Sequence, residues 1–549
     1  MTDARGGTRG EADRPAVRTT VSIVPQSALA ANGELLLALE EAFPVRFVGS
    51  SDAEIDASGA AIVFPGGVRP SRLPIPCLSL TGGPAPGGGD RAVGVEMARD
   101  AGLDRALHGQ SLRDEHHGLP APVPVGRGFR VLATAFGAPV WVVKDSPAGR
   151  EETASAHPPM LGEREFLRDH LTAGRFWSLL PIAHFLKRLS FGLSGALERH
   201  RACFVIDDPN VRFSSYGHVH FGALARDARD CGYHVALATI PLDLVLPGGR
   251  TAGVLREFPS HLSLAVHGND HVRHELARPS ARDAERIARS AVARVERFER
   301  RVGVRVDRVM CPPHGAFCPA ALSALFRAGF LGLAASTPFG WDGFSEHRAW
   351  RLGGWLPAQL TAGGFPVIPR YPLARSLDDL VFRALLGLPL VVYCHHGDLR
   401  AGLEPLRAAA ARIAALGTVD WMSLSSIARD CVRMCTVDDA LEVILFSRDA
   451  RIPRPDAPVV HVKIPRVFDV TDPILLAIDG ERHDVTPRPD GGAELHVTTP
   501  AGGPTLRVQM LARDGLRAAT AWGWCPRPWP VARRAMTETR DRLAPFIRE

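Results

Sequence analysis

Two adjacent carboxylates follow a short apolar segment in the sequence Ile206-Asp207-Asp208-Pro209-Asn210. Neighbouring carboxylates are costly to bury unless cations meet them. Because adjacent side chains point in different directions, one carboxylate can bind a metal ion while the other accepts a proton. A lone Asp-Asp pair is more often a turn or a helix cap, so its meaning depends on the motifs that accompany it.

A pair of histidines follows another apolar segment, in the sequence HGNDH at residues 267–271. Two imidazoles four residues apart can face one metal ion from a helical turn or a tight loop. The spacing is common in a chain with 21 histidines, but this pair is expected to end a strand of the same sheet as the Asp-Asp motif. We therefore predict that Asp208, His267 and His271 bind one divalent metal ion. A site of two histidines and one carboxylate suits Zn²⁺, and it also fits Co²⁺, Mn²⁺ or Fe²⁺.

A third polar motif, YCHHGD at residues 393–398, follows the apolar segment LVV. A histidine there can act as a general acid toward a leaving amine, because its reference pKa of about 6.5 suits proton delivery near neutrality. A lone histidine after a strand is more often a hydrogen-bonded polar residue with no catalytic part. The sequence does not decide which of His395 and His396 faces inward.

Taken in order, these motifs and PPHG at residues 312–315 resemble the NodB-homology polysaccharide deacetylases, also called carbohydrate esterase family 4. The resemblance covers about residues 200–430, less than half of the chain. It implies a distorted (β/α) barrel that hydrolyses N-acetyl groups, or occasionally other amides, with one divalent metal. The roles that it implies are catalytic base for Asp207, metal ligand for Asp208, His267 and His271, catalytic acid for His395, and one groove wall for the motif that contains Pro313 and His314.

Cys311 marks a departure from the family pattern. The double proline of the family is normally preceded by an Arg that pairs with the catalytic base, whereas Cys311 stands there in this chain. Asp207 then needs another cation. Arg370, at the end of the apolar segment FPVIPR, is the candidate.

Two further departures affect the substrate more than the metal. Pro209 follows the two acids where the family usually has Gly. The motif that orients the acid histidine has no clear match, although Trp341-Asp342 lies in the right interval. A backbone N–H near Tyr216 or Gly217 is expected to stabilise an oxyanion. The residues expected to contact substrate are Asn269, Pro313, His314, Trp341 and Arg370.

Alternating strands and helices are expected to position these motifs. From Ala202 to about Val432, short apolar segments alternate with helices, which implies a parallel sheet, open or closed into a barrel. Polar residues end nearly every expected strand, and in a barrel that rim gathers catalytic groups. The helices are expected at residues 219–231, 280–301, 319–329, 376–387 and 402–416.

The flanking regions give the rest of the predicted architecture, an α/β protein with a NodB-like barrel at residues 200–432. A small open-sheet α/β domain precedes the barrel and a β-sandwich follows it. The glycine-rich loops of the first domain lack the spacing of a nucleotide-binding fingerprint, so no chemistry is assigned to it. The predicted bounds are a disordered tail at 1–18, the α/β domain at 19–148, a helical connector at 149–199, the β-sandwich at 433–515, and a linker with a C-terminal helix at 516–549.

Composition restricts the partners. The net charge of +6 is spread over 65 basic and 59 acidic side chains with no long basic run, so nucleic acid is not expected to bind. The nine cysteines form no paired CxxC motifs, which favours reduced thiols in the cytoplasm. The first residues lack the apolar core of a secretory signal, and the most apolar helical stretch, residues 176–189, is too short to span a bilayer.

These observations predict a metal-dependent hydrolase of an N-acetyl or N-formyl amide, on an amino sugar or glycan. One alternative is a catalytically weak barrel that serves as a carbohydrate-binding module, which the missing Arg before the double proline favours. A second is a deacylase of a small metabolite, which the absence of a signal sequence favours. A third, less supported, is a multidomain enzyme of glycan assembly whose first domain binds a partner or a nucleotide-linked group.

Overall fold

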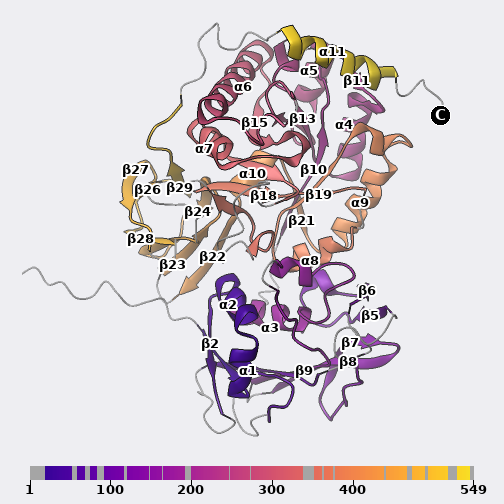
Figure 1. Cartoon of the computed structure of the whole chain (residues 1–549), viewed down its shortest axis with the longest axis vertical. Helices are drawn as coiled ribbons and strands as arrows, with labels where there is room; N and C mark the ends of the chain where they lie inside the picture. Colours follow the sequence, from indigo (N-terminus) through magenta and orange to yellow (C-terminus); the bar gives the residue numbers. More distant parts are fainter. Residues whose placement is uncertain are drawn as a thin grey trace, which may run out of the picture. The chain divides into compact units, whose positions relative to one another are not determined.

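The protein is described by a computed structural model (Figure 1). Trp341 and its neighbours lie outside the described residues, as do residues 1–18, so the predictions made for them are not addressed. The chain divides into two compact units; the first comprises Met1–Leu103, Gly109–Gly162 and Gly174–Leu193, and the second Asp104–His108, Glu163–Ala173 and Ser194–Glu549. The structure describes residues 19–51, 59–68, 75–82, 92–116, 120–146, 149–162, 165–191, 199–245, 248–272, 274–337, 352–361, 364–374, 377–437, 440–465, 473–488, 492–516 and 528–543.

The first unit contains a nine-stranded mixed sheet in the order β2-β1-β3-β4-β9-β8-β7-β5-β6. Strands β1 and β3 are buried on both faces, as is usual for parallel strands in α/β proteins. The helices of this unit are α1 (Gln26–Ala31), α2 (Gly33–Ala42) and α3 (Leu180–Phe191). The strands are β1 (Thr19–Val24), β2 (Val45–Gly49), β3 (Ala60–Val63), β4 (Cys77–Leu80), β5 (Val93–Met97), β6 (Ser111–Asp114), β7 (Arg130–Ala135), β8 (Ala138–Ser146) and β9 (Gly149–Ala154).

Strand β9 corrects the prediction of a helical connector at residues 149–199. Its sequence GREETA contains good helix formers, yet it lies in the middle of the sheet, parallel to β4 and antiparallel to β8. Hydrogen bonding on both edges outweighs the modest intrinsic preference of Glu and Ala for a helix. The long helix of this region, α3, begins only at Leu180.

The second unit contains a ten-stranded sheet in the order β17-β18-β16-β15-β14-β13-β10-β20-β19, with β21 paired to β10. All of its pairings except β17 with β18 are parallel, so the carboxyl ends of the parallel strands lie at one edge. The strands are β10 (His200–Asp207), β13 (Val235–Thr239), β14 (Leu262–His267), β15 (Val306–Cys311), β16 (Gly332–Ala335), β17 (Gln359–Thr361), β18 (Phe365–Pro369), β19 (Tyr371–Pro372), β20 (Leu390–Cys394) and β21 (Val419–Trp421).

Helices alternate with these strands, as the sequence pattern predicted. The longest, α6, begins after Ser280, whose side chain accepts a hydrogen bond from the backbone N–H of Asp283, and ends at Gly303 in a left-handed conformation. Its buried residues recur at helical spacing and pack it against the rest of the unit. The helices are α4 (Phe221–Cys231), α5 (Gly249–Glu257), α6 (Ala281–Val302), α7 (Pro319–Arg327), α8 (Asp379–Leu385), α9 (Glu404–Ala414) and α10 (Leu424–Arg429).

The sheet of the second unit has two ends in the described residues, and a closed barrel therefore stays a prediction. Strand β18 pairs with β16 near one end, and β19 pairs with β20 at the other. Along the chain, only Arg370 separates β18 from β19. The chain itself thus connects the two sides of the sheet, with Arg370 at the crossing point.

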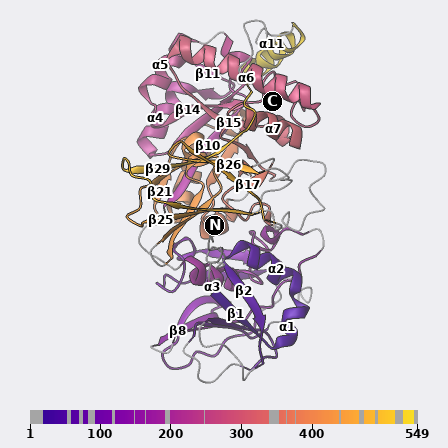
Figure 2. The ribbon, with the colours of Figure 1, turned by 90° about the vertical axis from the view of Figure 1, so that its left-hand side faces the viewer.

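Two four-stranded sheets follow, in the orders β22-β23-β25-β28 and β24-β29-β26-β27. Burial alternates along β25 and β29, the pattern of strands with one face on a core. The second unit ends with α11 (Pro528–Leu543) (Figure 2). None of the helices in the described part of the chain is long and apolar enough to cross a bilayer. The strands are β22 (Val432–Val437), β23 (Ala440–Leu445), β24 (Asp449–Pro453), β25 (Val459–Ile464), β26 (Ile474–Ile478), β27 (Glu481–Val485), β28 (Ala493–Thr498) and β29 (Thr505–Leu511).

His234, buried at the start of β13, predicts how stability depends on pH. Its Nδ1 lies 2.9 Å from the Ser260 carbonyl oxygen, and burial lowers the pKa of His234 to about 4. The unfolded chain takes up this proton near the ordinary pKa of about 6.5, whereas the folded protein does so only near 4. The free energy of unfolding is therefore expected to decrease by about 3 kcal/mol as the pH falls from 6.5 to 4.

Denaturant unfolding between pH 4 and 7 checks this expectation. The His234→Gln variant, which keeps a hydrogen-bonding side chain but cannot titrate, should lose this part of the pH dependence. If the free energy of unfolding changes equally with pH in the parent protein and the variant, the assignment to His234 is contradicted.

Candidate active site

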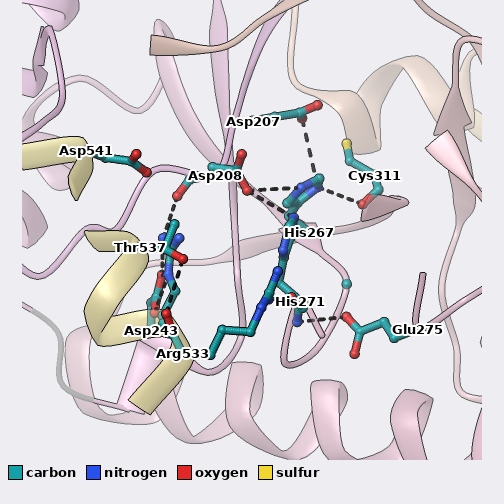
Figure 3. A network of polar contacts seen from close by, with 12 residues as sticks. Asp207, Asp208, Asp243, His267, His271, Glu275, Cys311, Arg533, Thr537 and Asp541 are labelled. Atoms are coloured by element: carbon teal, nitrogen blue, oxygen red, sulfur yellow. Dashed lines mark hydrogen bonds and ion pairs between the residues drawn. The ribbon is translucent and has the colours of Figure 1, made fainter. Parts of the chain in front are cut away.

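The three predicted metal ligands lie together at the carboxyl edge of the sheet (Figure 3). Asp208 Oδ1 is 3.4 Å from His267 Nε2 and 3.2 Å from His271 Nε2. The three ligand atoms all lie within 4.8 Å of one another. Parallel pairing of β10, β13 and β14 brings the two motifs to the same edge, although about 60 residues separate them.

The hydrogen bonding of His267 indicates that a cation belongs between these groups. Its Nδ1 is 2.9 Å from the carbonyl oxygen of Cys311, the neighbouring residue on β15, and must donate to it. In the neutral ring, Nε2 then carries a lone pair, which faces the carboxylate of Asp208. Two tetrahedral ligands at about 2.0–2.1 Å from a zinc ion are separated by about 3.3 Å. The spacing and chemistry of the three residues therefore fit a divalent metal.

The charges around the cluster act differently on its three residues. Although burial opposes it, hydrogen bonding and charge from His267, with a contribution from His271, hold the pKa of Asp208 below its usual range. Burial and the neighbouring His267 lower the pKa of His271 to about 4. Burial alone would lower the pKa of His267, but Asp207 and Asp208 raise it. An ionised Asp208 and a neutral His271 are the states that a metal requires.

Glu275 shapes the loop that carries the two histidines. Its carboxylate accepts hydrogen bonds from the backbone N–H groups of Asn269 at 2.7 Å, Asp270 at 3.2 Å and His271 at 3.0 Å. Gly268 has φ +64°, and a Cβ there would lie 2.2 Å from Glu275 Oε1. The tight turn therefore needs glycine at this position. Glu275 could not be named from the sequence, because no motif spacing distinguishes it from a surface acid.

Asn269 was expected to contact substrate, but the structure gives it another neighbour. Its side chain is buried, and its Oδ1 accepts a hydrogen bond from Arg294 Nη1 at 3.0 Å. The same nitrogen donates to the Asn269 carbonyl oxygen at 3.1 Å and pairs with Asp270 at 2.5 Å. Arg294, on α6, thereby holds the loop that carries Asn269 and Asp270, a contact that the sequence pattern did not predict.

Arg370 lies against Asp207, the carboxylate for which a replacement cation was predicted. Its Nη1 is 2.9 Å from both carboxylate oxygens, and the two side chains are each 3% exposed. The guanidinium also lies over the ring of Tyr393, 4.2 Å from its centroid. Cys311, in the place of the usual Arg, is buried beside His267. The position of Arg370 between β18 and β19 explains how a distant segment supplies this charge.

Of the two candidate acid histidines, His396 is the one that faces other site residues. His395 is exposed, whereas His396 is half-buried and meets the Tyr216 ring edge to face, with the two ring centroids 5.3 Å apart. His396 Nε2 lies 3.9 Å from Asp541 Oδ1. Burial lowers the pKa of His396, and the charges of Asp541 and Asp208 oppose that effect.

The PPHG motif lies next to the metal ligands. Pro313 is buried, and His314 adopts φ +58° with its ring 5.2 Å from that of His271 and 5.0 Å from that of His274. This arrangement places His314 at the side of the cluster without making it one of the three grouped ligands.

Several solved structures are similar to this chain. Agd3, a novel carbohydrate deacetylase, is 10% identical with a TM-score of 0.44, over 90% of this chain and 98% of that one. A family 4 carbohydrate esterase from Streptomyces lividans is 13% identical with a TM-score of 0.24, over 40% of this chain and 87% of that one. An exo-type maltose-forming amylase from Pyrococcus sp. ST04 is 10% identical with a TM-score of 0.26, over 42% of this chain and 48% of that one.

Neither the family models nor the curated proteins searched include a match to this sequence. Any conclusion about the chemistry of the chain therefore depends on the residues of the site.

Proposed function

We propose that this protein is a metal-dependent hydrolase of an N-acetyl or N-formyl amide, on an amino sugar or glycan, with Zn²⁺ the ion that suits the ligands best. The observation that carries the proposal is the grouping of Asp208, His267 and His271 beside the buried pair of Asp207 and Arg370. A structural site would be expected to close with four protein ligands, whereas three leave a position for reactants.

Each remaining polar group of the site has a distinct part in this proposal. A bound divalent ion supplies a Lewis acid for the amide carbonyl and makes water more acidic. Asp207 accepts the proton of the attacking water, and Arg370 orients its carboxylate and balances its charge. His396 delivers a proton to the departing nitrogen, in place of His395, which the family resemblance implies as the acid and which stays the alternative. A backbone N–H near Tyr216 or Gly217 remains our candidate for stabilising the oxyanion.

The buried Asp207–Arg370 pair also bears on the alternative of a catalytically weak binding module. That alternative was favoured by the absence of the usual Arg before the double proline. Arg370 provides the same charge from the junction between β18 and β19. A scaffold that only binds glycans needs neither this pair nor an acid histidine, so hydrolysis is the better-supported proposal.

Gly217→Ala is expected to test the part assigned to His396, together with the backbone N–H proposed near Gly217. Gly217 has φ +52°, and a Cβ there would lie 2.2 Å from His396 Nδ1, so the imidazole must move. We expect kcat to fall at least about 10-fold, because misplacing a general acid forfeits part of a contribution of typically 10²–10⁴-fold. Metal content should be unchanged, since Gly217 touches none of the three ligands.

Gly397→Ala is the matched control for this variant. A Cβ on Gly397, the residue after His396, would meet no atom within 4 Å, and its φ is not in the left-handed region. Its kcat should stay within about twofold of the parent protein. Equal activities of the two alanine variants would argue against His396 and in favour of His395.

The proposed function is tested by an assay for acetate and formate release. The purified protein is incubated with N-acetylated and N-formylated amino sugars, as monomers and as oligomers, before and after chelation and after zinc is returned. Release that is lost on chelation and restored by zinc supports the proposal. Hydrolysis of monomers alone would favour the small-metabolite deacylase, and no release from any substrate with bound zinc would overturn the proposal.

A further inference from the structure

The C-terminal helix α11 contacts the rest of its unit through charged rather than apolar side chains. Its buried residues include Arg534 and Asp541, which are 7% and 5% exposed. Its large apolar residues Trp529 and Met536 are 63% and 59% exposed. A helix that served only to cover a core would bury its apolar face. Charges are buried where they have specific partners. The residues that contact the buried charges of α11 therefore indicate what the helix does.

Arg534 binds the backbone of a metal ligand. Its Nη2 donates a hydrogen bond of 2.7 Å to the carbonyl oxygen of Asp208, while its Nε lies 2.9 Å from the carboxylate of the buried Asp243. Asp208 has φ +75°, a conformation that residues with a Cβ rarely adopt. The hydrogen bond and the ion pair together hold the backbone that aims the Asp208 carboxylate at the histidines.

Arg533 makes the equivalent contact with a second metal ligand. Its Nη1 donates a hydrogen bond to the carbonyl oxygen of His271, which has φ +52° (Figure 3). Two ligands with left-handed backbones are thus each held through their carbonyl by consecutive arginines of one helix. More than 260 residues separate each arginine from its partner along the chain.

Asp541, two turns further along α11, faces the acid histidine. Its Oδ2 accepts a hydrogen bond of 2.5 Å from the Tyr216 hydroxyl, and its Oδ1 lies 3.9 Å from His396 Nε2. The rings of Tyr216 and His396 meet edge to face. Asp541 therefore fixes Tyr216, against which His396 packs, and it stands beside the imidazole.

We propose that α11 is a positioning element of the active site, in which Arg533 and Arg534 hold the metal ligands Asp208 and His271, and Asp541 holds His396. This inference rests on the proposed function for the role of His396. Its part concerning the metal ligands does not depend on turnover.

Zinc affinity tests the role of Arg534. Arg534→Gln would leave Asp243 buried without a cation, so the double variant Arg534→Gln/Asp243→Asn removes both charges and keeps hydrogen-bonding groups. Competition with a chelator is expected to show zinc binding weakened about 10- to 100-fold, the usual effect of losing groups that orient metal ligands. Met536→Ala, an exposed position of the same helix, should bind zinc like the parent protein.

Kinetics test the role of Asp541. Asp541→Asn is expected to keep its zinc affinity while kcat falls about 10-fold and KM stays nearly constant, and Asp541→Glu should recover part of the loss. A purely structural helix would instead lower zinc affinity and thermal stability alike in the variants at 534 and 541.

The outcomes separate the two proposals. If the parent protein binds no zinc, the proposed function and this inference both fail. If the parent binds zinc and the Arg534→Gln/Asp243→Asn variant binds it equally well, only the inference about the arginines fails. Unchanged kcat in Asp541→Asn, in a protein that hydrolyses amides, would overturn the role of Asp541 alone.

Discussion

Asp207→Asn is expected to lower kcat by about 10²- to 10⁴-fold, the usual contribution of a positioned general base, while the protein keeps its metal. Asparagine has nearly the same shape but cannot accept the proton of the attacking water. Asp207 is not one of the three grouped ligands, so the metal content should stay at one ion per chain. Steady-state acetate release and elemental analysis of the same preparation measure the two quantities.

The Asp207→Asn variant requires a stability control, because Asp207 pairs with Arg370. Asp207→Asn leaves Arg370 in a buried position without a full counter-charge, and breaking a buried pair typically costs about 3–5 kcal/mol. The double variant Asp207→Asn/Arg370→Met should therefore be more stable than Asp207→Asn alone. If both variants are folded and unfold cooperatively in denaturant, and Asp207→Asn retains activity within about twofold of the parent, Asp207 is not the base.

Replacing both metal histidines, His267→Ala with His271→Ala, is expected to abolish stoichiometric metal binding and reduce amide hydrolysis to the level of the chelated parent protein. One carboxylate cannot hold a zinc ion against a chelator, because two of the three protein ligands are gone. In the parent protein, added zinc should also raise the Tm, since an ion that binds only the folded state stabilises it. The double variant should show no such shift.

His314→Ala is the matched control for the metal variant. The His314 ring lies 5.2 Å from that of His271 but outside the ligand group. We expect this variant to keep one ion per chain and the zinc-dependent rise in Tm. One retained equivalent of metal in the His267→Ala/His271→Ala protein would contradict the proposed site, and loss of metal in His314→Ala would require a different ligand set.

The alternation of strands and helices in the second unit could be predicted from the sequence. Apolar segments such as CFVI and LSLAV can be buried on both faces only in a parallel sheet covered by helices. Their polar ends must then meet at one edge, which is why Asp208, His267 and His271 could be named without a structure. Arg370 could be named because a buried Asp207 needs a cation and FPVIPR ends at the same edge.

Some features could not be predicted from the sequence, because strand pairing or contacts between residues far apart in the chain decide them. GREETA reads as helical, but its place between β4 and β8 makes it a strand. The choice between His395 and His396 depends on which ring meets Tyr216. The hydrogen bond from Arg294 to the side-chain oxygen of Asn269 could not be predicted either.

The sequence by itself was thus enough to predict two carboxylates and a histidine pair at the strand ends of one sheet. Residue type and strand periodicity are local properties, and they suffice for that prediction. Only the tertiary structure decided which residues contact the backbone of those groups: Glu275 and Arg533 at His271, and Arg534 at Asp208. Such contacts join the ends of separate elements, and their energy depends on geometry that no spacing along the chain encodes.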